Sequence, residues 1–396
     1  MRMKFNKSRQ LLMVSAASLL AASLLTACST LTVDFVYVTS SKAAGSNNYG
    51  EVDVFEINSE SGFMRQIPTS PFPSGGRNPV AEALSTDNKN LYVVNRDDNT
   101  IVQFAIGSDG KIYPQATVNT PGIYPLAATV AGSNLFVADT YQPLPACSDA
   151  SPCSGSVGVL PLSSAGAMGA PVANGSLTYW PLTLSGKAAA DIVLPTGIAT
   201  LANGSDLYVS AYDSTAKAGY VFGFAIGSGG ALAPLSGSPW AAGTQPSALV
   251  SDAASAHLYV TDSANGNVLG YTVSGGSLSP LSGSPYKTGG QPSAIAVDAK
   301  AGYLYVTNSQ DSTVTAFSIG SGPLTTIGTY PTGLQPVAVG VDPGQHHFVF
   351  TVNFLGSSVS GYGVNTDGSL YGSQDSPYSS NAQPTAAVAI PHNGSL

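Results

Sequence analysis

Charged side chains are scarce in this chain. They make up 9% of its 396 residues, whereas about a quarter is usual in soluble proteins. Four of the 14 basic residues lie before residue 10, so the rest of the chain sets ten basic residues against 22 acidic ones. A basic surface that could bind nucleic acid is therefore excluded, and we expect no nucleic-acid partner.

Histidine and arginine are also rare. The chain has four histidines, and the arginines that follow residue 27 are Arg65, Arg77 and Arg96. So few arginines in an acidic chain make a phosphate site a poor match. No P-loop, nucleophile elbow or dinucleotide-binding motif stands in a suitable context. We expect neither a metal nor a cofactor.

The chain has three cysteines, and two of them lie close together. Cys147 and Cys153 are separated by five residues in a segment that is rich in serine and proline. In an oxidising compartment this spacing predicts a disulfide that staples one loop. A metal-binding pair is the alternative, although no third or fourth ligand with suitable spacing lies nearby.

The N-terminus has the pattern of an export signal. Basic residues precede an apolar run over residues 11–25, which is too short to remain as a transmembrane helix. The run ends in Leu-Thr-Ala-Cys at Cys28, and this ending resembles the lipobox of bacterial lipoproteins. An ordinary secretory signal with an unrelated cysteine is the alternative.

The lipobox resemblance implies a division of the chain. Residues 1–27 are then a signal peptide, Cys28 carries the lipid, and residues 28–34 form a short tether to the membrane. Ser29 follows the cysteine in place of aspartate, which by resemblance to Gram-negative sorting rules implies the outer membrane where one exists. We expect an exported protein that is anchored in the cell envelope and contacts the membrane through this lipid.

Two sequence markers each recur seven times. An aromatic residue followed by valine or threonine marks an expected strand at Tyr37, Tyr92, Phe136, Tyr208, Tyr259, Tyr305 and Phe350. A proline opens another expected strand at Pro79, Pro125, Pro195, Pro246, Pro292, Pro336 and Pro384. Most spacings match the 40 to 50 residues of a four-stranded blade.

These markers predict an all-β, seven-bladed β-propeller with four-stranded blades over residues 35–396. The phase of the repeat is informative, because the chain begins with a second strand and ends with a first strand at 384–390. We therefore expect the C-terminal strand to complete the first blade and close the ring, which leaves no open edge. Such a propeller is expected to be monomeric.

Several motifs link the repeats to known families. Tyr305-Val-Thr-Asn308 resembles the YVTN propeller repeat, and the segments 232–240 and 278–286 resemble the outer strand of the seven-bladed lactonases. Members of that family hydrolyse 6-phosphogluconolactone or cyclise muconates. The resemblance implies a Pro-Arg-His run at one blade junction, but none of the seven prolines is followed by Arg-His.

The expected blade topology sorts the loops between two faces. The insertions at 40–50, 139–155 and 211–219 join second to third strands, and the connector 163–192 ends on the same face, which we expect to be the ligand face. The histidines are expected on the opposite face, at His257, His346, His347 and His392.

Glu82 breaks the repeat, because the equivalent positions in the other blades are apolar. An acid on an innermost strand should have a raised pKa or a cationic partner. We hypothesise that Glu82, with Arg77 or Arg96, marks a central polar site with a catalytic role. A salt bridge or a solvated channel lining is the alternative.

The second strands end in a series of polar residues that could ring the mouth of the propeller: Asn95, Asp139, Asp262, Asn308 and Asn353. Local turn formation is the alternative role for these residues. Tyr141 and Tyr212, in the long insertions, could stack on sugar rings or could simply pack against their neighbours.

The sequence thus predicts a lipid-anchored binding or protein-interaction module whose ligand is a carbohydrate or an envelope protein. The alternative function is a lactone hydrolase of the 6-phosphogluconolactonase type that uses Glu82 or a mouth aspartate as its general base.

Overall fold

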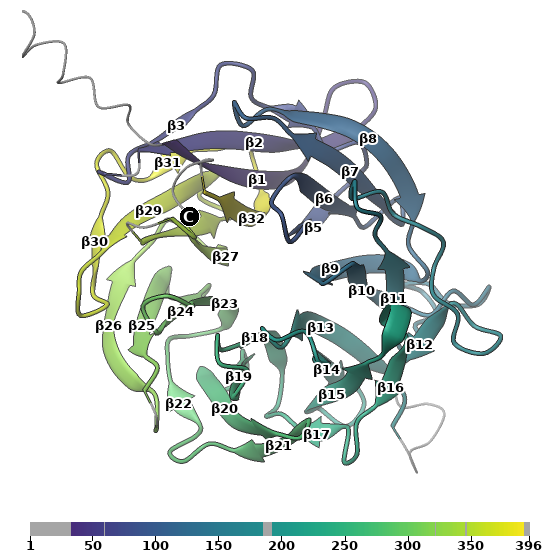
Figure 1. Cartoon of the computed structure of the whole chain (residues 1–396). Helices are drawn as coiled ribbons and strands as arrows, with labels where there is room; N and C mark the ends of the chain where they lie inside the picture. Colours follow the sequence, from purple (N-terminus) through teal and green to yellow (C-terminus); the bar gives the residue numbers. More distant parts are fainter. Residues whose placement is uncertain (1–32, 59, 185–191, 321, 345–346, 392–396) are drawn as a thin grey trace, which may run out of the picture.

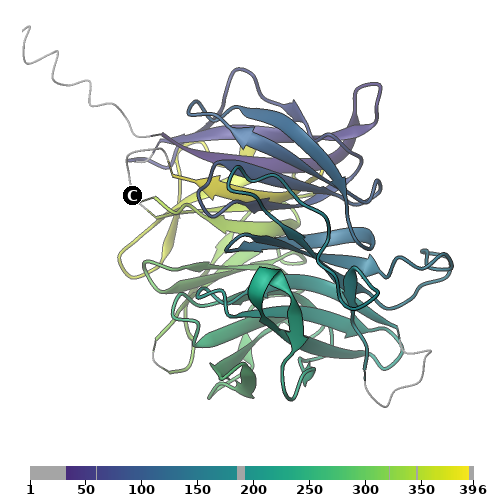
Figure 2. The ribbon, with the colours of Figure 1, turned by 45° about the vertical axis from the view of Figure 1, so that its right-hand side comes forward.

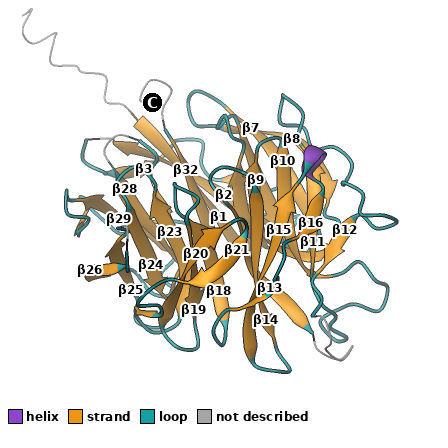
Figure 3. Cartoon of the chain, turned by 60° about the horizontal axis from the view of Figure 1, so that its bottom comes forward, coloured by secondary structure: helices purple, strands orange, loops and turns teal. Residues whose placement is uncertain are grey.

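The chain forms a ring of seven β-sheets around a central axis (Figure 1). The computed structural model describes residues 33–391 except 59, 185–191, 321 and 345–346. Strands make up most of the described chain, and a single 3-10 turn, η1 (Ser228–Gly230), stands apart from them (Figure 3). The predicted all-β, seven-bladed propeller is confirmed.

Each blade is an antiparallel sheet, and its strands are numbered here from the innermost, beside the axis, to the outermost. The innermost strands are β32 (Pro384–Ile390), β5 (Pro79–Leu84), β9 (Ile123–Ala131), β13 (Val193–Thr200), β18 (Pro246–Ser251), β23 (Pro292–Asp298) and β27 (Pro336–Val341). The second strands are β1 (Val33–Ala44), β6 (Asn90–Asn95), β10 (Asn134–Tyr141), β14 (Asp206–Asp213), β19 (His257–Asp262), β24 (Tyr303–Asn308) and β28 (Phe348–Asn353). We number the blades 1 to 7 in this order.

The third and outer strands complete the blades. The third strands are β2 (Tyr49–Asn58), β7 (Thr100–Ile106), β11 (Ser156–Pro161), β15 (Ala218–Ile226), β20 (Asn267–Ser274), β25 (Thr313–Ser318) and β29 (Ser358–Val364). The outer strands are β3 (Met64–Gln66) with β4 (Phe72–Pro73), β8 (Ile112–Asn119), β12 (Tyr179–Pro181), β16 (Leu232–Pro234) with β17 (Trp240–Ala241), β21 (Ser277–Pro280) with β22 (Tyr286–Lys287), β26 (Thr325–Pro331), and β30 (Leu370–Gly372) with β31 (Tyr378–Ser379).

Four outer strands are split by a Ser-Pro turn. In blades 1, 4, 5 and 7 the serine hydroxyls of this turn accept hydrogen bonds of 2.9 to 3.0 Å from backbone N–H groups of the third strand. These serines are Ser70, Ser238, Ser284 and Ser376. The serine hydroxyl therefore takes the place of the carbonyl acceptor that a continuous outer strand would offer to this N–H.

The C-terminal strand closes the ring. β32 pairs antiparallel with β1, from Phe35 opposite Ile390 to Thr39 opposite Ala386, and the two strands lie side by side in Figures 1 and 2. Hydrogen bonds thus join residues from the two ends of the described chain. The predicted closure is confirmed, and it leaves no free edge between the first and last blades.

Apolar side chains fill the space between neighbouring blades. The tyrosines of several second strands are fully buried there, and they donate hydrogen bonds to glycine carbonyls in the hairpin of the next blade. Tyr92 binds the carbonyl of Gly166 at 2.7 Å, and Tyr208 binds that of Gly276 at 2.8 Å. In these blades the aromatic marker of the repeat therefore acts as an inter-blade clamp, since its hydroxyl links one blade to the next.

Two of the three insertions are longer strands rather than loops. β1 runs to Ala44 with an irregularity after Ser40, and β14 runs to Asp213, so that residues 40–50 and 211–219 largely extend their hairpins. They lie on the face formed by the turns between second and third strands and by the connections between blades, which we call the loop face.

The predicted signal peptide, Cys28 and residues 28–32 of the tether lie outside the described residues. Within the described ranges, no helix combines the length and the apolar character needed to span a membrane.

Candidate functional site

Glu82 is enclosed between two blades. It lies on β5 opposite Val93, its side chain is 8% exposed, and neither carboxylate oxygen has a hydrogen-bond partner among the described residues. Burial raises the pKa of Glu82 well above its ordinary value, and the backbone N–H of Val388 on β32 lowers it slightly. The carboxyl therefore faces the seam with blade 1, where burial favours its protonated form.

The structure does not bring Glu82 together with either predicted arginine. Arg77 donates to Asp98 at 2.6 Å, and Arg96 lies 3.1 Å from Asp97. Both arginines lie on the loop face, where nearby aspartates neutralise them, whereas the side chain of Glu82 turns into the protein. No cation compensates Glu82 among the residues that the structure describes.

The polar residues that end the second strands are buried beneath the loop face. Asn95, Asp139, Asp262, Asn308 and Asn353 are at most 2% exposed. Each packs against a glycine three residues before the blade proline, where a Cβ would come within 2.2 to 2.6 Å of the side chain. These glycines are Gly76, Gly122, Gly243, Gly289 and Gly333.

Three of these polar residues hold the connections between blades by hydrogen bonds. Asp262 accepts from the backbone N–H groups of Thr244 and Gln245, both at 2.9 Å. Asn308 accepts from the N–H of Gly289 at 2.9 Å, and Asp139 accepts from that of Gly122 at 3.0 Å. Burial raises the pKa of Asp139 to about 8, although the hydrogen bond from the N–H of Gly122 opposes the shift.

Blades 1 and 4 have neither an Asn or Asp at this position of the second strand nor the glycine, and they explain why the two occur together. The second strand of blade 1 reaches Ser40 at this position and that of blade 4 reaches Ala211, and there the glycine is replaced by Asn381 and Ile192. A small residue on the strand thus makes room for a larger one in the connection. A Gly-x-x-Pro pattern is the sequence signal from which this packing could have been predicted.

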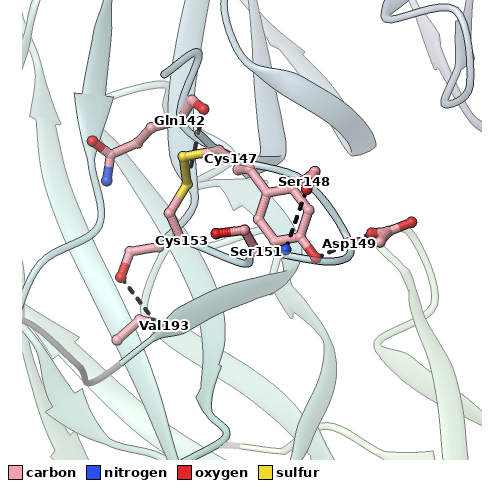
Figure 4. Close-up of a disulfide and its surroundings, with 9 residues drawn as sticks. Gln142, Cys147, Ser148, Asp149, Ser151, Cys153 and Val193 are labelled. Atoms are coloured by element: carbon pink, nitrogen blue, oxygen red, sulfur yellow. Dashed lines mark hydrogen bonds between the residues drawn. A yellow bond between two sulfur atoms is a disulfide. The ribbon is translucent and has the colours of Figure 1, made fainter. Parts of the chain in front are cut away.

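Tyr141 and the disulfide belong to one structured loop. The predicted Cys147–Cys153 disulfide is confirmed (Figure 4). The Tyr141 hydroxyl donates to Asp149 at 3.1 Å, and its side chain is 6% exposed, so it packs rather than presenting a free ring. Tyr212 is half-buried, and the Lys217 ammonium lies 5.8 Å from its ring centre.

The described histidines lie on the face opposite to the loop face, as expected. His257 is 2.8 Å from Asp252, and His347 is 3.0 Å from Asp298. His346 and His392 lie outside the described residues. Within the described part of the chain, no group of three or more histidines, cysteines or acids could hold a metal ion.

The loop face carries a polar cleft of 920 Å³ over blades 5 and 6. It is lined by Gln245, Ser247, Ser263, Ala264, Asn265, Gly266, Lys287, Thr288, Gly289, Gly290, Gln291, Pro292, Ser293, Ser309, Gln310, Asp311 and Val337. No histidine, arginine or aromatic residue belongs to this described lining. Of the predicted site residues, Asp262 and Asn308 lie below the cleft and hold its walls, but none lines it.

The two charged residues of the cleft are held by the backbone. The Lys287 ammonium donates to the carbonyl of Asn265 at 3.3 Å, and Asp311 accepts from the N–H of Gly290 at 2.6 Å. The remaining lining consists mainly of amides, hydroxyls and glycine. The cleft therefore offers many neutral hydrogen-bonding groups and no net charge.

The fold and the repeats define a seven-bladed propeller, and comparison with known families names its class. Residues 48–142 and 269–392 match the family described as Lactonase, 7-bladed beta-propeller. Since these segments make up more than half of the chain, the protein belongs to this family. A search of the curated proteins found no match.

Solved structures share the fold at low sequence identity. A candidate 6-phosphogluconolactonase of Bacteroides fragilis superposes with a TM-score of 0.74 and 17% identity, over 91% of this chain and 99% of that one. The periplasmic gluconolactonase PpgL of Pseudomonas aeruginosa gives 0.72 and 17%, with the same coverage. Hydrazine synthase of Kuenenia stuttgartiensis gives 0.56 and 15%, over 81% of this chain and 94% of that one. Propellers with different functions thus share this architecture.

Proposed function

We propose that this chain is an exported, lipid-anchored protein of the cell envelope whose propeller binds a ligand on its loop face. The observation that carries this proposal is the polar cleft over blades 5 and 6. Its volume of 920 Å³ lies within the range of about 300–1,000 Å³ that is typical of ligand sites, and its polar lining suits a polar ligand. The ligand is a carbohydrate or a polar segment of an envelope protein.

Binding explains the cleft better than catalysis does. Hydrolysis of a lactone requires a base that activates water and a donor that stabilises the developing oxyanion. Asp311 and Lys287 are the charged groups of the described lining, and each already contacts a backbone group. Glu82, the acid expected to act as the base, is enclosed between blades.

The binding function can be tested with a soluble form that starts at Ser29. Its thermal stability would be measured against isolated envelope polysaccharides, and its interaction partners would be captured from detergent-solubilised envelopes. Ala264→Trp fills the cleft, whereas Ala254→Trp places the same ring on an exposed turn of the same blade on the opposite face. We expect the first substitution to abolish binding and the second to preserve it; equal binding by both variants would exclude the cleft.

The lipid anchor is tested separately. Metabolic labelling with an alkyne fatty acid should mark the full chain in the membrane fraction, and Cys28→Ser should remove the label and release the protein from that fraction. Labelling that persists in the Cys28→Ser variant would contradict lipidation at this residue.

Family membership favours lactone hydrolysis as the second candidate function. Hydrolysis of gluconolactone and its 6-phosphate would be followed by pH-stat for the soluble form, Asp311→Asn and Glu82→Gln. The binding function predicts no acceleration over the spontaneous reaction. Acceleration that is lost in Asp311→Asn would identify an enzyme whose base lies in the cleft. Acceleration that is lost in Glu82→Gln would instead identify Glu82 as the base.

A further inference from the structure

Two glutamines of the cleft occupy equivalent positions in neighbouring blades. Gln245 and Gln291 each precede the proline that opens the innermost strand. The backbone carbonyl of Gln245 accepts from the N–H and the hydroxyl of Ser263, both at 2.9 Å. The carbonyl of Gln291 accepts from the same two groups of Ser309, at 3.0 and 2.9 Å. The two backbone carbonyls therefore accept the same pair of hydrogen bonds.

The side chains of these glutamines are available to a ligand. Both residues are exposed and line the cleft. Neither carboxamide has a hydrogen-bond partner within the part of the chain that the structure describes. Blades 5 and 6 therefore each contribute one carboxamide to the cleft lining, and a carboxamide carries both a donor and an acceptor.

The backbone at Gln291 shows that glutamine stands there at a cost. Its φ is 51°, in the left-handed region where glycine is free of strain and a side chain is not. Gln335 and Gln383, at the same position in the next two blades, have φ values of 53° and 60°. Gln245 lacks this conformation and Gln383 has it outside the cleft, so the left-handed backbone belongs to the connection between blades and not to the lining of the cleft.

The charge of the cleft restricts what the amides can recognise. Lys287 and Asp311 cancel one another, and the described arginines of the loop face, Arg77 and Arg96, lie in blade 2 with their own aspartates. A phosphate or carboxylate would thus meet one exposed ammonium, that of Lys287, and would also be repelled by the Asp311 carboxylate in the same lining. Hydroxyl groups donate and accept at once, and they match both halves of a carboxamide.

We infer that Gln245 and Gln291 form a recognition pair for an uncharged, hydroxyl-rich ligand, a neutral sugar or polyol, and that the cleft discriminates against phosphorylated and carboxylated sugars. This inference rests on the proposed function, because it names the ligand class of the same cleft. It assigns specificity to the amide pair and not to the polar residues beneath it.

The test compares ligands of matched size by calorimetry, with galactotriose as the neutral probe and trigalacturonate as the carboxylated one. The soluble form should bind the neutral probe at least tenfold more tightly. Gln291→Glu and Gln245→Glu, which add a negative charge at nearly constant size, should each weaken this binding by roughly tenfold or more. Gln383→Glu is the matched control, since Gln383 has the same motif and exposure but does not line the cleft.

A reversal of specificity makes the test sharper. Gln291→Arg should improve binding of trigalacturonate relative to galactotriose, because it adds a second cation beside Lys287 and gives the cleft a net positive charge. Circular dichroism and thermal unfolding of every variant would establish that the propeller is intact, and Gln383→Glu should bind galactotriose as the parent does.

The outcomes separate this inference from the proposed function. Tighter binding of trigalacturonate that Ala264→Trp abolishes would overturn the inference and leave the cleft as a ligand site. Capture of an envelope protein through the cleft, with neither sugar bound, would do the same. If both glutamate variants bind galactotriose as tightly as the parent does, recognition by the pair Gln245 and Gln291 would also be overturned. Absence of any cleft ligand in both assays would remove the proposed function itself.

Discussion

The buried carboxyl of Glu82 predicts a stability that falls as pH rises. In the unfolded chain a glutamate ionises near pH 4.3, whereas burial keeps the folded carboxyl protonated to far higher pH. The folded protein therefore binds one proton more than the unfolded chain between these two pKa values. Each pH unit in this window costs about 1.4 kcal/mol of unfolding free energy.

Substitution by leucine should remove this penalty. Leu249 occupies the equivalent position in blade 5, with the same burial against its neighbouring blade. Glu82→Leu should raise the free energy of unfolding by about 1–3 kcal/mol at pH 5, because two unpaired buried oxygens disappear. The gain should grow between pH 5 and pH 7, by about 1.4 kcal/mol for each pH unit that lies below the pKa of the folded carboxyl.

The assay is equilibrium denaturation of the soluble form at pH 5, 6 and 7. Glu82→Gln provides the control, because it keeps buried polar atoms but cannot ionise; it should lose the extra pH dependence without the full gain of leucine. Other buried acids, among them Asp139 with its pKa of about 8, contribute to the slope of all three proteins, so the difference between variants is the quantity to compare. Parallel pH profiles of the parent and Glu82→Leu would refute the buried, unpaired carboxyl.

Three further predictions concern the contacts between blades and the disulfide loop. Tyr92→Phe leaves a glycine carbonyl of the next blade unpaired and should cost about 1–3 kcal/mol in chemical denaturation; an unchanged midpoint would contradict the inter-blade clamp. Gly333→Ala brings a Cβ within 2.5 Å of Asn353 and should cost about 1–3 kcal/mol. Asn353→Ser should recover much of that loss, and additive losses in the double variant would argue against direct contact. Reduction of the Cys147–Cys153 disulfide should expose residues 142–155 to proteolysis while the blades stay folded, and global unfolding on reduction would show a wider role.

Much of the fold could be predicted from the sequence because its signals are local and repeated. The Tyr-Val pair at Tyr305 and the proline at Pro292 each mark a strand within a few residues, and seven copies fix the number of blades. The phase of the same repeat predicted the pairing of β32 with β1. Two closely spaced cysteines in an exported chain, without further metal ligands nearby, predicted the disulfide that the structure contains.

The site was far less predictable, because it depends on which residues meet across blades. The sequence shows that Glu82 is an acid on an innermost strand, but only packing turns it toward the seam with blade 1 and away from the arginines. Asp262 and Asn308 were expected at the mouth, and the fold buries them under glycines that come from another strand's connection.

The seven-bladed ring, its closure and its disulfide loop could all be predicted from the sequence alone. The ring and its closure follow from short repeated motifs, and the loop follows from two cysteines that lie close together. The position of the polar cleft could be recognised only in the tertiary structure. The cleft combines Gln245 with Gln291, and its floor and walls come from the connections of separate blades. Such a surface exists only after the blades pack, because packing determines which polar groups become buried anchors and which remain free in solvent.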